Sequence, residues 1–257
     1  ADAVQVYKGL NIGSAKVTEE EKEGIPHHLL DFKEVTEEYT IYHYQKDCRE
    51  KIKDIQSRNK TPILVGGTGL YIKAALYDYK LSEEKSTNTY DNLTNEELYE
   101  ELKKLDKDII IDKDNRRRLI RAINYYKENN ESINKNKTNK LLYNVIFIGL
   151  TTDRQVLYDK INKRVDEMIS QGLLEEVKSF YDKGIKSKPL LNAIGYRELY
   201  NYLDGNCTKE EAIEKIKQNS RHYAKRQYTF FNHQLPIVWF ETDYNNFNNT
   251  IEKVASY

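Results

Sequence analysis

The stretch TPILVGGTGLYIKAAL, residues 61–76, decides the fold class of this chain. Residues 61–65 form a short apolar run that ends in Gly66-Gly67-Thr68-Gly69, after which apolar residues recur at helical spacing. A continuous apolar run followed by glycines predicts a buried parallel strand, a tight turn and a helix. Because residues 42–58 before it carry an amphipathic helical pattern, the unit is helix, strand, turn and helix, which is typical of an α/β fold.

Similar patterns predict further elements along the chain. A Thr followed three residues later by Glu or Gln is the capping box that begins a helix, and it occurs at Thr94, Thr152 and Thr208. Apolar runs predict the strands, and apolar periodicity predicts the remaining helices. The predicted strands cover 4–7, 145–150 and 237–240, and the predicted helices cover 94–105, 116–126, 153–171, 173–181 and a long segment after 208.

Residues 81–141 interrupt the α/β pattern. The stretch 82–92 is polar without periodicity, and 128–140 is rich in Asn and Lys, so both are expected to be loops beside two predicted helices. We therefore expect three segments: a first part of the core over 1–80, a helical insertion over 81–141, and a second part of the core over 142–257.

Composition excludes several classes of protein. The chain has 257 residues, of which 39% are hydrophobic and 32% are charged, as in globular proteins. No apolar run approaches the roughly 18 residues of a membrane span, and the first residues lack a signal-peptide pattern. Cys48 and Cys207 lie far apart, and His27-His28 has no third ligand at a suitable spacing, so no disulfide scaffold or transition-metal site is expected. We expect a cytoplasmic monomer without a membrane partner.

Charge points to a local basic surface rather than a global field. The chain has 41 Lys and Arg residues against 41 Asp and Glu residues. Basic residues cluster at 116–121, and they alternate with aromatic residues over 221–231, where cations could bind phosphates and rings could stack on bases. The alternatives are a solvated helix face for the first cluster and an amphipathic core helix for the second.

Two other features could serve chemistry. The turn Gly66–Gly69 would allow a phosphate or a base to approach the backbone, although it could equally be only a tight turn. Asp2 precedes the predicted strand 4–7, where a carboxylate can accept a proton from a reacting nitrogen. The alternative for Asp2 is a solvated terminal carboxylate.

Seven blocks in the same order resemble tRNA dimethylallyltransferases over nearly the whole chain. The blocks are 2–16 (DAVQVYKGLNIGSAK), 24–31 (GIPHHLLD), 65–71 (VGGTGLY), 117–122 (RRLIRA), 161–166 (INKRVD), 193–198 (AIGYRE) and 223–227 (YAKRQ). The resemblance implies an α/β fold like that of P-loop NTPases, a fold that binds ATP and other nucleotides. Its core would be a parallel sheet flanked by helices, with a helical insertion. The resemblance further implies transfer of a dimethylallyl group from dimethylallyl diphosphate to N6 of adenosine 37, in the anticodon loop of tRNA, assisted by Mg²⁺.

The resemblance also assigns roles to residues. It makes Asp2 the general base and Arg164 a ligand of the diphosphate, and it expects the ligands of Mg²⁺ mainly in a P-loop that precedes the position of residue 1. The family usually has Ser where this chain has Ala3. By the same resemblance the expected tRNA contacts are Asp2, Ala3, Val4, Gln5, Thr68, Arg117, Arg118, Leu119, Ile120, Arg121, Asn192, Ala193, Ile194, Gly195, Tyr196, Arg197, Lys225, Arg226, Gln227, Tyr228, Thr229, Phe230 and Phe231.

Three other functions remain open from the sequence. An adenylate isopentenyltransferase would use the same core on a free nucleotide and would not need the basic segments. A small-molecule P-loop kinase would bind ATP and leave those segments unexplained. A non-catalytic RNA-binding module would keep the basic surface without turnover.

Overall fold

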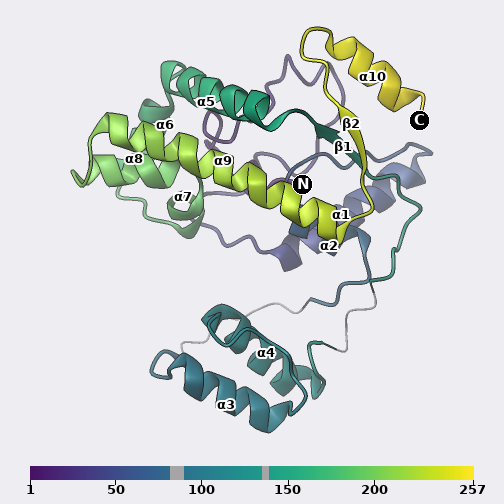
Figure 1. The fold of residues 1–257 in the computed structure, drawn as a ribbon, viewed down its shortest axis with the longest axis vertical. Coiled ribbons are helices and arrows are strands. Elements are labelled where there is room, and N and C mark those ends of the chain that lie inside the picture. Colours follow the sequence, from purple (N-terminus) through teal and green to yellow (C-terminus); the bar gives the residue numbers. More distant parts are fainter. Residues whose placement is uncertain (82–89, 135–138) are drawn as a thin grey trace. The chain divides into compact units, whose positions relative to one another are not determined.

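The computed structural model describes residues 1–81, 90–134 and 139–257, so parts of the loops expected at 82–92 and 128–140 lie outside the described residues. The chain forms two compact units (Figure 1). The first comprises Ala1–Tyr39, Glu50–Ile72 and Val145–Tyr257, and the second comprises Thr40–Arg49 and Lys73–Asn144. The expected insertion, 81–141, falls inside the second unit.

A parallel pair of strands lies in the first unit. β1 (Ile148–Thr151) pairs with β2 (Val238–Glu241), with Ile148 opposite Val238. Both strands occur where apolar runs predicted them: β1 begins three residues later than predicted, and β2 is displaced by one residue. Within the described ranges these are the only two paired strands.

The apolar run at 61–65 is not a strand, contrary to expectation. Ile63 is 84% exposed and Val65 is 74% exposed, although a buried strand was predicted there. A parallel strand is stable only when it forms hydrogen bonds with an adjacent strand and when other elements bury both of its faces. Among the residues that the structure describes, no strand lies beside this run, so its apolar side chains stay uncovered.

The segment 4–7 is a turn rather than the predicted strand. The Oδ1 atom of Asp2 accepts hydrogen bonds from the backbone N–H groups of Val4 and Gln5, and Tyr7 N donates to Val4 O at 3.1 Å. These local bonds curl the backbone as an Asp-initiated turn does. Only Tyr7 makes a strand-like contact, a single bridge to Lys33.

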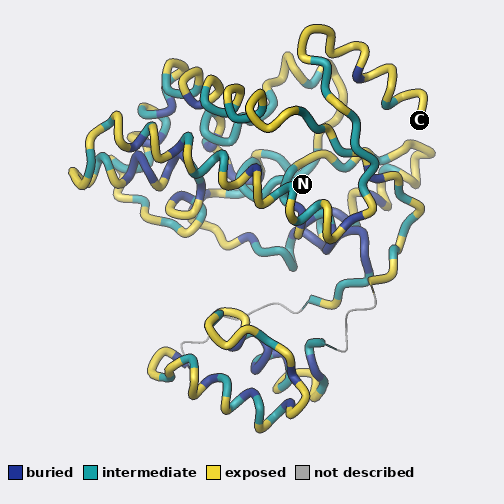
Figure 2. The backbone as a smooth tube through the Cα atoms, in the orientation of Figure 1, coloured by how far each residue is buried: buried dark blue, intermediate teal, exposed yellow. Residues whose placement is uncertain are grey.

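Helices form most of the first unit. The long helix α9 packs against α5 and α8, and α6 and α7 pack against α8. Their contact surfaces contain fully buried apolar side chains, including Leu173, Leu199 and Ile216. Figure 2 shows buried residues as dark blue stretches along these helices. The helices are α5 (Arg154–Ser170), α6 (Leu173–Tyr181), α7 (Lys188–Asn192), α8 (Tyr196–Leu203), α9 (Lys209–Gln234) and α10 (Phe247–Ala255).

Two of the three predicted capping boxes are confirmed. Thr94 begins α3 and Thr208 begins α9, each with its Glu bonded back to the cap backbone. Thr152 is not a cap, because Asp153 occupies that position and its Oδ1 accepts from Gln155 N at 2.8 Å and from Val156 N at 3.2 Å. A carboxylate is the stronger cap, so it displaces the start by one residue.

The second unit has its own core. α3 (Asn95–Leu105) and α4 (Arg116–Asn129) bury Leu98, Leu102 and Leu119 against each other. The helices α1 (Ile41–Ser57) and α2 (Gly69–Leu76) each have residues in both units. No helix in the described part of the chain is both long enough and apolar enough to cross a membrane.

Candidate functional site

The glycine turn holds the first residues of the chain. Thr68 N donates to Ala1 O at 3.1 Å, and Ala3 N donates to Thr68 Oγ1 at 3.2 Å. The amino group of Ala1 also donates to Val65 O. Because bonds on both sides of residue 2 attach the backbone to this turn, Asp2 lies at the turn that precedes α2.

The carboxylate of Asp2 is fixed through one oxygen. Its Oδ1 accepts from Val4 N at 2.7 Å and from Gln5 N at 3.0 Å. Its Oδ2 accepts no hydrogen bond from any residue that the structure describes. A half-buried carboxylate with one oxygen held and one oxygen open has the arrangement that a general base requires.

Besides burial, the charge of Asp2 contributes to the raised pKa values of two nearby tyrosines, Tyr71 and Tyr223. Burial raises the pKa of Tyr71 well above its usual value, and the negative charge of Asp2 raises it further. Desolvation of the hydroxyl likewise raises the pKa of Tyr223 against a smaller lowering by its hydrogen bond with Thr68, although the residue as a whole remains 38% exposed. Both tyrosines are therefore neutral hydroxyl donors at physiological pH.

Helix α9 packs directly on the glycines. Gln227 Nε2 donates to Gly67 O at 2.9 Å, and a Cβ atom at Gly67 would lie 1.9 Å from that same nitrogen. A Cβ atom at Gly69 would lie 2.3 Å from Cδ1 of Phe230. The two glycines therefore allow α9 to approach the turn closely, and a Cβ atom at either position would displace the side chain of Gln227 or the ring of Phe230.

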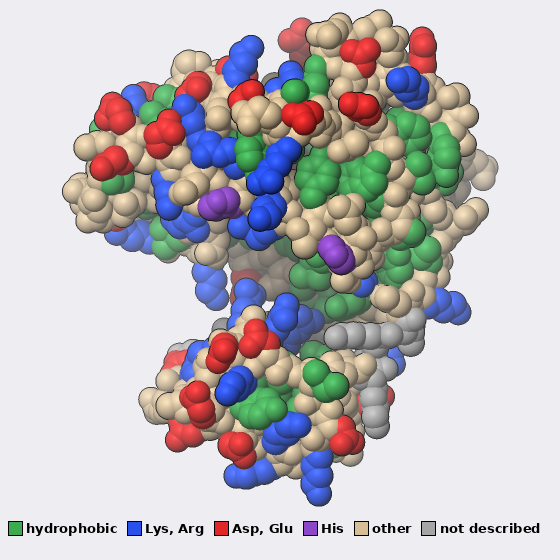
Figure 3. Space-filling view, in the orientation of Figure 1, with side chains coloured by type: hydrophobic (Ala, Val, Ile, Leu, Met, Phe, Trp, Pro, Cys, Tyr) green, Lys and Arg blue, Asp and Glu red, His purple; other side chains and the backbone are tan. Residues whose placement is uncertain are grey.

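Arg164 has no partner among the residues that the structure describes. It is exposed on α5 and forms no hydrogen bond or ion pair with another described residue, whereas its neighbour Lys163 pairs with Glu167 at 3.6 Å. Nearby on the chain, Asn162 accepts a hydrogen bond from Arg221 of α9 at 2.5 Å. Figure 3 shows Lys and Arg side chains gathered over the middle of α9, where α5 packs against it.

In the segment 225–231 the basic side chains are exposed, whereas the ring of Tyr228 is packed. Lys225 and Arg226 are exposed. Tyr228 stacks on Trp239, with ring centroids 5.2 Å apart, and its hydroxyl bonds to Thr151 Oγ1 at 3.1 Å. The cations are thus open to a ligand, while this ring belongs to the packing of the unit.

The segment 192–197 is mostly internal. Asn192 and Arg197 are exposed, whereas Ala193 and Tyr196 are buried. Arg197 Nη2 forms an ion pair with the buried Glu198 at 2.6 Å. The side chains of Asn192 and Arg197 are open to a ligand, whereas the side chain of Tyr196 packs inside the unit.

The cluster at the start of α4 offers two open cations in the second unit. Arg117 and Arg118 are exposed and have no hydrogen-bond or ion-pair partner through their side chains in the described part of the chain, while Leu119 is fully buried. Arg121 is half-buried and does have an interaction partner. Neither Asp112 nor Asp114 forms an ion pair with any described arginine.

Sequence reasoning missed the two tyrosines beside Asp2. Tyr223 precedes Gln227 by four residues, so helical spacing already places both on one face of α9. Tyr71 follows the glycine turn by two residues, but nothing in its local pattern indicates that it lies near residue 2.

The comparisons with known proteins identify the family. The sequence profile described as IPP transferase matches residues 5–234. The chain belongs to the IPP transferase family. A tRNA dimethylallyltransferase from Anoxybacillus flavithermus is 48% identical over all of this chain and 86% of that protein. The α/β fold that the sequence predicted is therefore confirmed through the family.

Two solved structures of the family resemble this one. The tRNA isopentenylpyrophosphate transferase from Bacillus halodurans has 39% identity and a TM-score of 0.73, covering 99% of this chain and 86% of that one. A eukaryotic dimethylallyltransferase described as acting on tRNA has 27% identity and a TM-score of 0.88, covering 99% of this chain and 70% of that one.

The resemblance implies that Mg²⁺ assists the reaction, with its ligands mainly in a P-loop that precedes the position of residue 1. Nowhere in residues 1–81, 90–134 and 139–257 do three His, Cys, Asp or Glu side chains converge as metal ligands. Asp2 already uses Oδ1 for two backbone donors. The described residues on their own therefore do not form a Mg²⁺ site.

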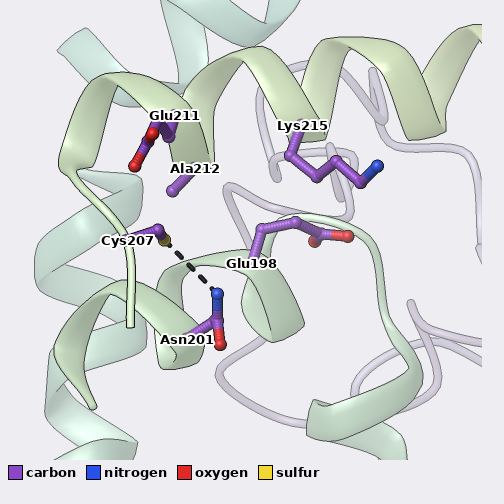
Figure 4. Close-up of a pocket in the computed structure, with 6 residues that line it drawn as sticks. All are labelled: Glu198, Asn201, Cys207, Glu211, Ala212 and Lys215. Atoms are coloured by element: carbon purple, nitrogen blue, oxygen red, sulfur yellow. Dashed lines mark hydrogen bonds between the residues drawn. The ribbon is translucent and has the colours of Figure 1, made fainter. Parts of the chain in front are cut away.

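A small cavity lies apart from this site of the IPP transferase. It measures about 250 Å³ and is bounded by side chains of α8, α9 and the turn between them, among them Glu198, Cys207 and Lys215 (Figure 4). Lys215 precedes Tyr223 by eight residues, a rise of about 12 Å along α9. The cavity therefore does not contribute to the site at Asp2.

Proposed function

We propose that this chain is a tRNA dimethylallyltransferase, which transfers a dimethylallyl group from dimethylallyl diphosphate to N6 of adenosine 37 in tRNA and releases diphosphate. The observation that carries the proposal is the carboxylate of Asp2, held through Oδ1 with Oδ2 open, on a glycine turn covered by α9. The names of the relatives support the choice of substrates.

Asp2 would act as the base. The exocyclic amine of adenine is a weak nucleophile, and removal of its proton as the new bond forms strengthens it. N6 attacks the first carbon of the dimethylallyl group, the carbon–oxygen bond to the diphosphate breaks, and the electron pair leaves with the diphosphate. The proton from N6 passes to Asp2 Oδ2, so that atoms and charge balance.

Arg164 would bind the leaving diphosphate. Its guanidinium has no protein partner among the described residues, and a planar guanidinium binds phosphate oxygens through two parallel hydrogen bonds. Negative charge grows on the diphosphate as the bond breaks, so a guanidinium bound to it stabilises the transition state more than the ground state.

Exposed cations would bind the tRNA backbone. Arg117, Arg118, Lys225 and Arg226 are all exposed, and cations of this kind neutralise phosphates. The target adenine must leave its stack to reach a carboxylate in a folded site. We expect the protein to act in the cytoplasm as a monomer.

One assay separates this proposal from its alternatives. The full-length protein is incubated with labelled dimethylallyl diphosphate and either tRNA or AMP, and separately with labelled ATP. Label on tRNA supports the proposal, label on AMP favours an adenylate isopentenyltransferase, phosphate transfer favours a kinase, and tRNA binding without transfer favours a binding module.

The role of Asp2 is tested in the same assay. Asp2→Ala should lower kcat by roughly 10²–10⁴-fold with little change in tRNA binding, because only the proton acceptor is lost. Asp182→Asn, at an exposed carboxylate after α6, is the control and should have normal activity. Near-normal turnover by Asp2→Ala contradicts the assignment.

A further inference from the structure

We propose that Glu176 of α6 is the positioning residue for Asp2: its carboxylate fixes the loop 11–13, and that loop, continued to residue 15, holds the turn that carries the base. The inference rests on the proposed function, because it assigns Glu176 an effect that acts through Asp2. Glu176 itself touches neither substrate nor the reacting atoms.

Glu176 accepts hydrogen bonds from three successive backbone N–H groups. Its Oε2 accepts from Asn11 N at 3.0 Å and from Ile12 N at 2.8 Å, and its Oε1 accepts from Gly13 N at 3.1 Å. The hydroxyl of Tyr196 also donates to Oε1. With four donors, a carboxylate has used nearly all of its acceptor capacity, so its orientation is fixed.

The side chain of Gln5 connects this loop to Asp2. Gln5 Nε2 donates to Ser14 O at 3.0 Å and to Ala15 O at 3.2 Å, just beyond the residues that Glu176 binds. The backbone N–H of Gln5 in turn donates to Asp2 Oδ1 at 3.0 Å. Gln5 therefore connects the loop to the carboxylate by hydrogen bonds alone.

Glu176 also connects the loop to the segment 192–197. Tyr196 is fully buried, and a Cβ atom at Gly13 would lie 2.5 Å from its ring. The hydroxyl and the ring of Tyr196 thus meet the carboxylate and the loop at the same place. Glu176 thus links, through the loop 11–15 and Gln5, the two segments 2–5 and 192–197, for which the family resemblance predicts tRNA contacts.

This role requires both terminal side-chain atoms of residue 176 to accept hydrogen bonds. A carboxylate only accepts hydrogen bonds, whereas the amide of a glutamine presents two donors on one side. In Glu176→Gln the nitrogen would face either the backbone N–H groups of Asn11 and Ile12 or the backbone N–H of Gly13 and the hydroxyl of Tyr196. A loop that loses acceptors in this way shifts, and the shift passes along Gln5 to Asp2.

The test is a double-mutant cycle in the full-length protein. Glu176→Gln should lower kcat by on the order of 10²-fold, as expected for a base displaced by about 1 Å, with an unchanged KM for dimethylallyl diphosphate. Glu175→Gln, at the exposed neighbouring carboxylate, is the matched control and should keep normal kcat. In an Asp2→Ala background Glu176→Gln should have little further effect on kcat, because residues that act as a unit are not additive.

A merely structural role gives a different result. If Glu176→Gln lowers kcat equally in both backgrounds, or leaves kcat normal in the wild-type background, the inference is overturned. If Glu176→Gln does not fold, Tyr196→Phe decides by the same cycle, since it removes one donor to Glu176 and keeps the ring on Gly13. Faster amide exchange at residues 11–13 should accompany the loss of kcat, and unchanged exchange overturns the inference.

Failure of the proposed function is distinguishable from failure of this inference. If Asp2→Ala transfers label to tRNA at a normal rate, the assignment of the base has failed and the inference falls with it. If Asp2→Ala is inactive while Glu176→Gln is normal, the base assignment stands and only the positioning role is wrong.

Discussion

Replacing Gly66 with alanine tests whether the glycine turn sets the position of Asp2. The backbone φ angle of Gly66 is +146°, and a Cβ atom there would lie 2.2 Å from Ala1 O and 2.6 Å from Ala1 C. Both are backbone atoms, and Ala1 O already accepts the N–H of Thr68. Ala1 cannot turn away from the new methyl group without breaking that bond.

The size of the effect follows from these distances. Ordinary contact for a Cβ atom begins near 3.4 Å, so the backbone at Ala1 must move by about 1 Å to restore it. Asp2 is the next residue and moves with it. Displacement of a reacting group by about 1 Å costs on the order of 10²-fold in rate, so kcat should fall by about that factor. Strain at the positive φ angle should also lower the free energy of unfolding by about 1–3 kcal/mol.

A second glycine provides the control for backbone strain. Gly205, between α8 and α9, has a φ angle of +79°, and a Cβ atom there would meet nothing within 4 Å. Gly205→Ala should lower thermal stability but leave single-turnover transfer to tRNA nearly normal. If Gly66→Ala has the stability loss and yet keeps a normal rate, the glycine turn does not position Asp2 and the reasoning is wrong.

Three further measurements test the charged groups. Arg164→Ala should raise KM for dimethylallyl diphosphate and lower kcat while tRNA affinity is kept, whereas Lys163→Ala, which removes an exposed cation beside it, should do neither; equal effects of the two variants would refute a specific diphosphate contact. Arg117→Ala should weaken tRNA binding and flatten the slope of log affinity against log salt by about 1, and an unchanged slope would mean that Arg117 contacts no phosphate. The backbone N–H and side chain of Thr94 hold the pKa of Glu97 below its usual value. The resulting stabilisation of α3 is complete above the ordinary pKa of 4.5 and is lost as pH falls through the lower folded value. Melting temperature should therefore fall less steeply on acidification in Glu97→Gln than in the parent, and identical acid limbs would contradict the shift.

Local patterns predicted seven of the ten helices in the described part of the chain, whereas α7, α8 and α10 were not predicted. The capping boxes at Thr94 and Thr208 were confirmed because all of their hydrogen bonds lie within four residues. The pattern failed at Thr152, where the adjacent Asp153 competes for the same backbone donors. Competition between neighbouring cap residues is decided by backbone geometry that the sequence pattern does not contain.

The strands were harder to predict, since a strand is defined by its neighbour. The run at 61–65 has the composition of a buried strand but has no paired strand among the described residues. The segment 4–7 also has strand-like composition, yet Asp2 captures its N–H groups in a turn. In both cases the decisive contacts lie outside the pattern that was read.

The sequence predicted individual residues of the candidate site but not the contacts between them. The family resemblance indicated Asp2, the glycine turn and Gln227, and the structure brings these together. Tyr223 was indicated only as part of the segment 221–231, and Glu176 was not indicated. The contact of Tyr223 with Thr68 and that of Glu176 with Asn11 each span more than 150 residues, where no local spacing connects them.

The hydrogen bond between Gly67 and Gln227 has a consequence for the order of folding. It joins residues 160 positions apart, so the site closes only after nearly the whole first unit has been synthesised. The α3–α4 core, in contrast, is assembled from residues within one short stretch, Tyr90 to Ile123. Contacts between residues close in sequence form faster than contacts between distant residues. On the ribosome the second unit should therefore form its core before α9 is synthesised and can pack on the glycine turn. A chain released before Gln227 would have a folded helical unit and no base in place.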